Sequence, residues 1–204
     1  SNRGFESLAL SPDGKTAYAI LQSPMGDPKS AQYSNSRVVR MLRLDCRNPL
    51  DIKVTGMFLV LQSNMSDYPA TSKQADLKFS DAAMLSDTQI LLLERATKKV
   101  KLIVADLKNA TNILDLPISL SLLPEEKSES LDTINIKPAE TSIAFNSVDV
   151  FFDLDTDKLE GMAVLTPSVV ALSNDNDFAL GENTTNYPSR VWYIQLGKEL
   201  PIAR

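Results

Sequence analysis

Residues 5–23 read FESLALSPDGKTAYAILQS, and this stretch sets the pattern of the chain. Two apolar runs flank Ser11-Pro12-Asp13-Gly14, whose proline and glycine suit a tight turn. Two runs of strand length around such a turn predict an antiparallel hairpin. The same order of acid, apolar run, turn, apolar run and polar pair returns at residues 80–95 and 159–175. We therefore predict a fold built from repeated hairpins.

Further runs of strand type follow these hairpins. They cover residues 37–44, 52–61, 101–107, 113–120 and 190–196. Because the hairpin strands are apolar nearly throughout, we expect them to be covered on both faces, with more exposed strands outside them. This arrangement predicts an all-β, β-propeller-like fold with blades at residues 5–62, 79–120 and 158–196.

Three blades are too few to close a ring, because propellers typically have ~4–8 blades. We interpret residues 1–204 as a partial β-propeller domain, made of three consecutive blades of an incomplete propeller of about six. The first residues contain neither a signal peptide nor an initiator methionine. The sequence therefore reads as part of a longer protein, with the N-terminal half of the propeller absent from it.

Composition argues against several classes of function. A net charge of −5 and a pI near 4.8 argue against nucleic acid as a partner. Histidine is absent, which excludes a Ser-His-Asp triad or a histidine-bound zinc made from this chain. Cys46 is the single cysteine, so no disulfide can form within the chain. No apolar run reaches the ~18 residues that indicate a transmembrane helix.

The hairpin repeat is expected to bring polar residues together. Antiparallel pairing places the start of a hairpin's first strand beside the end of its second strand. The predicted neighbours are Glu6 with Gln22 and Ser23, Asp81 with Glu94 and Arg95, and Glu160 with Asn174 and Asp175. Since first strands line the central channel of a propeller, all three groups should lie at one mouth of that channel. Arg3, just before the first strand, should stand on the same rim.

These polar residues predict a metal site and a reaction centre. Gathered carboxylates repel one another unless a cation lies among them, and calcium prefers carboxylate and amide oxygens. The residues predicted to hold calcium are Glu6, Glu160, Asn174, Asp175 and Asp177. The residues predicted to act in catalysis are Arg3, Asp81, Glu94 and Arg95. The arginines would bind an anionic substrate, and the acids would orient a water molecule. In the alternative interpretation, each acid only accepts hydrogen bonds from backbone N–H groups at the end of a strand.

Three stretches, residues 2–14, 158–163 and 174–178, resemble the phytase-like domain family, whose usual name is "esterase-like activity of phytase". Residues 91–95 and 104–107 extend this resemblance through the middle of the chain. It covers nearly the whole chain, but only the C-terminal half or more of the family domain. The resemblance implies a β-propeller and the hydrolysis of phosphoesters or esters.

Together, the repeat and the resemblance favour a metal-dependent phosphoester or ester hydrolase that acts on an anionic small-molecule ester at the channel mouth. Two alternatives stay open. One is a non-catalytic extracellular β-propeller that binds a protein or a glycan, and the other is a calcium-dependent, lactonase-like propeller. We expect the protein to be secreted, periplasmic or at the cell surface.

Overall fold

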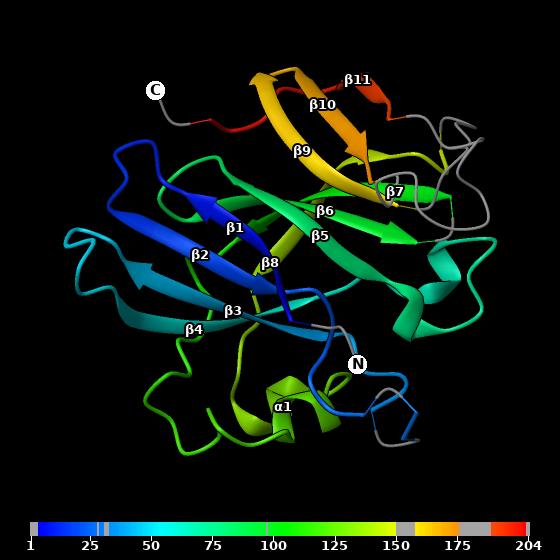
Figure 1. Ribbon diagram of the computed structural model, residues 1–204. Helices are drawn as coiled ribbons and strands as arrows, with labels where there is room; N and C mark the ends of the chain where they lie inside the picture. The colour runs from blue at the N-terminus through cyan, green and yellow to red at the C-terminus, as the bar shows by residue number, and fades with distance from the viewer. Residues whose placement is uncertain are drawn as a thin grey trace.

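The computed structural model describes residues 4–27, 29–30, 33–96, 98–149, 158–175 and 189–202. These residues form an all-β fold of three antiparallel sheets with a few short helical segments (Figure 1). The all-β prediction is confirmed. None of the helical segments among these residues has the length and apolar character of a membrane span.

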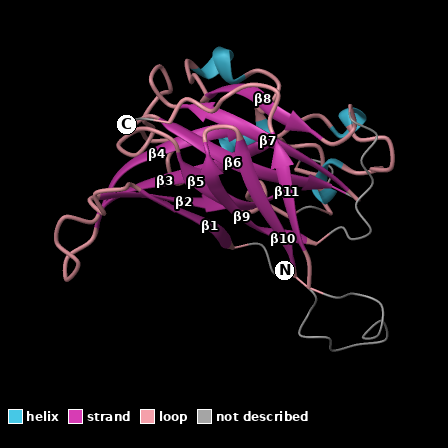
Figure 2. Cartoon of the chain, turned by 90° about the horizontal axis from the view of Figure 1, so that it is seen from above, coloured by secondary structure: helices cyan, strands magenta, loops and turns pink. Residues whose placement is uncertain are grey.

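Each sheet is a meander in which strands that follow one another in the chain are paired (Figure 2). The first sheet contains β1 (Phe5–Leu10), β2 (Thr16–Leu21), β3 (Val38–Asp45) and β4 (Lys53–Leu61). The second contains β5 (Lys78–Met84), β6 (Gln89–Ala96), β7 (Lys99–Asp106) and β8 (Glu140–Asn146). The third contains β9 (Leu159–Thr166), β10 (Val169–Asn174) and β11 (Val191–Gln195). The helical segments are Met65–Asp67, Gln74–Asp76, α1 (Leu123–Glu126) and Leu131–Ile134.

The first hairpin turns at the predicted tetrapeptide. The backbone N–H of Gly14 donates to the carbonyl of Ser11 at 2.9 Å, and that of Ser11 donates to the carbonyl of Thr16 at 2.8 Å. Gly14 has a φ of +69°, a left-handed conformation that glycine adopts without steric cost. The turn therefore fixes the pairing of β1 with β2.

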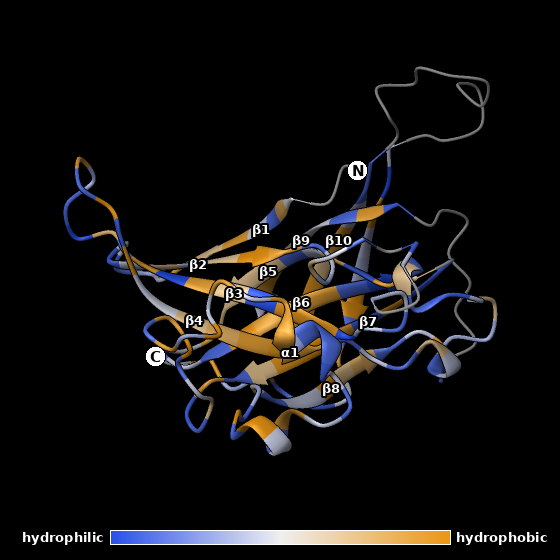
Figure 3. Ribbon diagram, turned by 90° about the horizontal axis from the view of Figure 1, so that it is seen from below, coloured by the Kyte–Doolittle hydropathy of each residue, from blue (hydrophilic) through white to orange (hydrophobic). Residues whose placement is uncertain are grey.

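The three sheets stack on one another, and apolar side chains fill the two spaces between them. Tyr18, Met41, Phe58, Phe79, Ile90 and Leu92 belong to the core between the first and second sheets. Leu91, Leu93, Leu102, Leu159, Val170 and Leu172 belong to the core between the second and third sheets. Strand β6 thus supplies alternate residues to both cores, as expected for a strand covered on both faces. Figure 3 shows the apolar residues concentrated on the strands and the polar residues on the loops.

The first strands of the three sheets lie side by side. Strand β5 contacts β1 on one side and β9 on the other, as Figure 1 shows. Residues at the starts of these strands are therefore brought towards one another from three distant parts of the sequence.

The second sheet differs from the sequence prediction. Residues 113–120 are not a strand, so the predicted second blade at residues 79–120 is wrong in its last element. The chain instead leaves the sheet after β7, crosses the outer face of the first sheet, and returns to form β8. Ile113, Leu131 and Ile136 of this crossing segment, residues 107–139, pack against the first sheet. The path of this segment depends on packing against residues that are distant in the sequence, and local periodicity does not reveal such packing.

Candidate functional site

A β-bulge occurs near the start of the first strand in each sheet. The pairing skips one residue between Phe5 and Ser7, between Phe79 and Asp81, and between Leu159 and Gly161. The three bulged residues are therefore Glu6, Ser80 and Glu160. A bulge bends the strand locally and changes the direction of its side chains, so these positions are structurally equivalent in the repeat.

This register changes the predicted alignment of the acids. The sequence pattern places Asp81 at the position of Glu6 and Glu160, whereas the structure places Ser80 there. Asp81 lies one position later and is equivalent to Ser7 and Gly161. Because side chains alternate along a strand, one position decides which way a side chain points.

Arg95, near the end of β6, joins two of the bulges. Its Nε donates to Ser80 Oγ at 2.7 Å, and its Nη2 donates to Glu160 Oε1 at 2.7 Å. The Arg95 side chain is 11% exposed and the Glu160 side chain is 37% exposed. The predicted groups around Asp81 and Glu160 therefore meet through a partly accessible ion pair between the second and third sheets.

Asp81 is occupied by backbone N–H groups. Its Oδ1 accepts from the N–H of Ala82 at 2.8 Å, and its Oδ2 accepts from the N–H of Met162 at 2.6 Å. Burial raises the pKa of Asp81, and both hydrogen bonds oppose that shift. Asp81 thus links β5 to β9. It behaves as the alternative interpretation of the sequence expects, because it accepts hydrogen bonds from backbone N–H groups.

Glu94 lies in the interior and not at the rim. It is fully buried, and it accepts from Tyr68 Oη at 2.7 Å and from the N–H of Ser63 at 2.8 Å. Burial raises the pKa of Glu94, and burial together with the charge of Glu94 raises the pKa of Tyr68. This buried position does not fit the predicted catalytic role of Glu94 beside Arg95, because successive residues of β6 face opposite sides.

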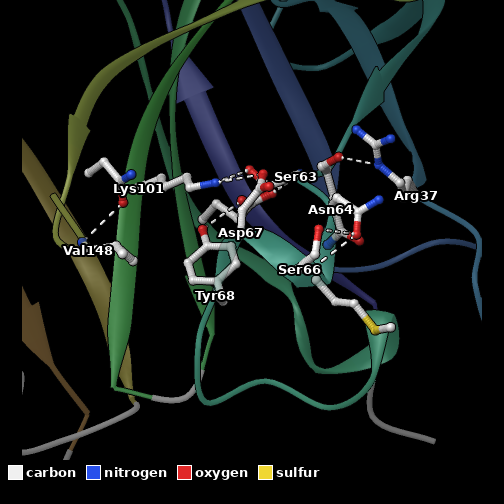
Figure 4. Close-up of polar contacts among 12 residues, drawn as sticks. Arg37, Ser63, Asn64, Ser66, Asp67, Tyr68, Lys101 and Val148 are labelled. Atoms are coloured by element: carbon white, nitrogen blue, oxygen red, sulfur yellow. Dashed lines mark hydrogen bonds and ion pairs between the residues drawn. The ribbon is translucent and has the colours of Figure 1, made fainter.

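A lysine completes the environment of Glu94. Lys101 Nζ donates to Asp67 Oδ2 at 3.0 Å and to Ser63 Oγ at 3.1 Å, and it lies 4.5 Å from the centre of the Tyr68 ring (Figure 4). These contacts tie the loop before β5 to strands β6 and β7. We interpret this group as one that holds the loop in place, because its carboxylate and ammonium groups all have hydrogen-bond partners within the protein.

The remaining predicted residues lie on β1, at the end of β10 or outside the described residues. Glu6 is exposed on β1, whereas Asn174 Oδ1 accepts from the N–H of Arg190 at 2.7 Å. The N–H of Asp175 donates to the carbonyl of Lys158 at 2.8 Å, so this end of β10 lies beside the start of β9 as predicted. Arg3 and Asp177 lie outside the described residues. In the described part of the chain, no group of three or more His, Cys, Asp or Glu side chains is placed to hold a metal ion.

A comparison with protein families bears on the whole chain. The family model of phytase-like proteins, described as "Esterase-like activity of phytase", matches residues 1–178. This chain belongs to the phytase-like family. No curated protein and no solved structure matches it.

In this phytase-like chain, sequence reasoning missed three residues that determine the roles of the predicted acids. Ser80 occupies the bulge, and Tyr68 and Lys101 accompany Glu94. The sequence does mark Lys101 as unusual, because this lysine interrupts the otherwise apolar run from Val100 to Ala105. Nothing in the sequence marks Ser80 or Tyr68, because the bulge and the fold of the loop before β5 depend on tertiary contacts.

Proposed function

We propose that this phytase-like protein hydrolyses a phosphoester or an ester with an anionic group at the rim where Arg95 meets Glu160. The observation that carries the proposal is their ion pair, which joins the second and third sheets and leaves Glu160 37% exposed. An arginine fork suits phosphate and carboxylate oxygens, and an adjacent carboxylate can accept a proton. The family description supports ester hydrolysis as the class of reaction.

In the proposed reaction, the substrate anion competes with Glu160 for the Arg95 guanidinium. The displaced carboxylate then accepts a proton from a water molecule, whose oxygen bonds to the phosphorus or acyl carbon. The bond from that atom to the alcohol oxygen breaks, and the proton on Glu160 passes to the departing alkoxide. Ser80 holds Arg95 from the other side, which makes it a positioning residue. Asp81 keeps β9 in place through Met162, and the buried Glu94 takes no part in the step.

We also propose that the three sheets are consecutive blades of a β-propeller. The antiparallel meanders and the adjacent first strands support this arrangement. Closing such a ring requires further blades, for a total of about six. Arg95 and Glu160 would then stand at the mouth of the central channel.

Calcium at this rim has a test of its own. Of the residues predicted to hold it, Glu6, Glu160, Asn174 and Asp175 belong to the described part of the chain, and Asp177 lies outside it. Glu160 is paired with Arg95, so a cation there would compete with the guanidinium. We place no step of the reaction on calcium. Turnover is measured in the chelator EGTA, with and without added calcium: loss and return would assign calcium to the site, and unchanged turnover would exclude it.

The direct test compares turnover of p-nitrophenyl phosphate and 4-acetoxybenzoate, an ester that carries a carboxylate, by the wild type, Arg95→Gln and Glu160→Gln. General acid–base catalysis typically contributes ~10²–10⁴-fold, so each variant should lose about 100-fold or more in kcat/KM. Arg37→Gln is the matched control, because Arg37 is also a part-buried, paired arginine but its partners are Gln62 and Glu129, outside the proposed site. Equal turnover in wild type and Glu160→Gln would overturn the assignment.

A non-catalytic binding module is the second candidate. The observation that favours it is that Asp81 and Glu94, the two predicted catalytic acids, both accept hydrogen bonds from donors within the protein. This candidate predicts that the wild type turns over neither ester, while Arg95→Gln still folds. Turnover above that of the Glu160→Gln variant would exclude it.

A further inference from the structure

A cavity lies at the end of the sheets opposite to Arg95 and Glu160. Its volume is about 520 Å³, within the ~300–1,000 Å³ typical of ligand pockets. It is formed by the β1–β2 turn, the adjoining ends of β3 and β4, and the β5–β6 turn, and so it opens between the first and second sheets. Six of its lining residues are charged: Asp13, Lys15, Arg43, Asp45, Arg47 and Asp87.

Four of these charges neutralise one another locally. Lys15 pairs with Asp13 at 3.1 Å, and Arg47 pairs with Asp45. The hydroxyl of Ser11 and the backbone and side chain of Lys15 lower the pKa of Asp13 to about 2. Hydrogen bonds from Arg47 lower the pKa of Asp45 to about 2 as well. Both acids are therefore ionised and already occupied at neutral pH.

Arg43 is held in one orientation. Its Nε donates to Thr55 Oγ1 at 3.2 Å, and its Nη2 donates to the carbonyl of Thr55 at 3.0 Å. The guanidinium carbon also lies 5.6 Å from the centre of the Phe58 ring, within the range of a cation–π contact. Tyr18 stands beside it, where burial raises the pKa of the phenol and Arg43 opposes that shift. A guanidinium has five N–H donors, so the contacts with Thr55 leave others for a ligand.

Asp87 provides the opposite charge from the other wall. It is exposed on the β5–β6 turn of the second sheet, and no residue in the described ranges forms an ion pair with it. Once the local pairs are set aside, the cavity presents one fixed cation and one anion. We propose that this cavity binds a small zwitterion, with its carboxylate at Arg43 and its ammonium group at Asp87.

A zwitterion fits this charge pattern better than a simple anion. A simple anion at Arg43 would leave Asp87 without a partner, whereas a carboxylate with a separate ammonium group is matched at both ends. Specificity of this kind comes from the cost of leaving either charge without a partner. The site is independent of the proposed hydrolysis, because none of its residues contributes to the pair of Arg95 and Glu160.

The test is a titration followed by the backbone amide NMR shifts of the chain. The probes are unbranched ω-amino acids from glycine to 6-aminohexanoate, each compared with the alkanoate and the alkylamine of the same length. Because a hydrogen bond to a charged group contributes ~1.5–3 kcal/mol, the best zwitterion should bind at least about 10-fold more tightly than either half-ligand. The chain length that binds best reports the spacing of the two charges.

Two variants test the binding of the two ends of the ligand separately. Arg43→Gln should weaken the zwitterion and the alkanoate by about 10-fold or more and leave the alkylamine unchanged. Asp87→Asn should remove the advantage of the zwitterion over the alkanoate. Since Asp87 is exposed on a turn, this variant keeps the test valid even if Arg43→Gln disturbs the fold. Lys137→Gln and Asp132→Asn, exposed charges outside the cavity, are controls that should bind like the wild type.

The proposal is overturned if no zwitterion of the series binds, or if the alkanoates bind as tightly as the zwitterions in the wild type. Wild-type affinity in Asp87→Asn, with the advantage of the zwitterion kept, would also overturn it. Chemical-shift changes that map to the cavity and disappear in Asp87→Asn support it.

Discussion

Arg95 on β6 donates to the Glu160 carboxylate on β9 at 2.7 Å, although the two residues are 65 positions apart in the sequence. Both sit at or beside a bulge, and Ser80, the bulged residue of β5, accepts from the same guanidinium. One side chain therefore links the starts of the first strands in two sheets. This contact positions the proposed site and also contributes to the packing of the sheets.

The first prediction concerns the stability that this pair provides. Because Glu160 is 37% exposed and solvent screens the charges, Arg95→Gln should lower the free energy of unfolding by only about 1 kcal/mol. Urea unfolding of the two single variants and of Arg95→Gln/Glu160→Gln gives their coupling energy. A loss of several kcal/mol would show that Arg95 is mainly structural, and a large fall in turnover with little loss of stability fits the proposed role.

The sequence predicted the three hairpins, because apolar runs and turn residues are local signals, and the polar ends of the second and third hairpins meet at Arg95 and Glu160. It did not predict which side chains face the rim. The choice between Ser80 and Asp81 depends on the bulge in β5, and Glu94 and Arg95 exchange roles if the register moves by one residue. Bulges are set by packing between sheets, which one sequence does not reveal. The same reason explains why β8 follows the crossing segment and does not lie at residues 113–120.

The second prediction concerns the crossing segment, residues 107–139. Arg40 of β3 and Glu125 of α1 form a bidentate pair at 2.7 Å with exposures of 4% and 1%, and Arg40 also donates to the carbonyls of Ser119 and Ser121. Removing one partner of a buried pair leaves an uncompensated charge, so Glu125→Gln should cost about 3–5 kcal/mol. Urea unfolding measures this cost, and limited proteolysis should show earlier cleavage within the segment.

Glu129→Gln is the control for this pair. Glu129 lies 3.6 Å from Arg37 and its side chain is 70% exposed, so its loss should cost less than about 1 kcal/mol. If Glu125→Gln were as stable as Glu129→Gln, the segment would not depend on the buried pair for its attachment.

The third prediction concerns pH and Glu94. Burial raises the pKa of this carboxyl above its value in the unfolded chain. At a pH between these two pKa values, the folded protein holds a proton that the unfolded chain has lost. The contribution of Glu94 to the free energy of unfolding is therefore complete below the pKa of the unfolded chain, ~4.3, and is lost as the pH rises through the pKa of the folded protein. Glu94→Gln cannot titrate. The free energy of unfolding of the wild type minus that of the variant should fall as the pH rises from about 4 to 7. Urea unfolding over this range measures the difference, and a constant difference would contradict the shift.

The fourth prediction concerns Gly161, the residue that follows the bulge of β9. A Cβ at this position would lie 2.3 Å from Ser173 Oγ on β10 but 3.6 Å from Ser173 Cβ. Gly161→Ala therefore forces the Ser173 hydroxyl to rotate and should cost about 0.5–1.5 kcal/mol, the cost of a displaced rotamer.

Removing the Ser173 hydroxyl tests this cause. The double variant Gly161→Ala/Ser173→Ala leaves only the ordinary 3.6 Å contact and should recover most of the lost stability. Gly197→Ala is the control, because a Cβ there has no atom within 4 Å and the change should be neutral or slightly stabilising. Thermal unfolding of the four proteins, with the wild type included, compares them directly. If Ser173→Ala fails to rescue Gly161→Ala, the clash is not with the hydroxyl, and the requirement for glycine arises from the backbone of the bulge itself.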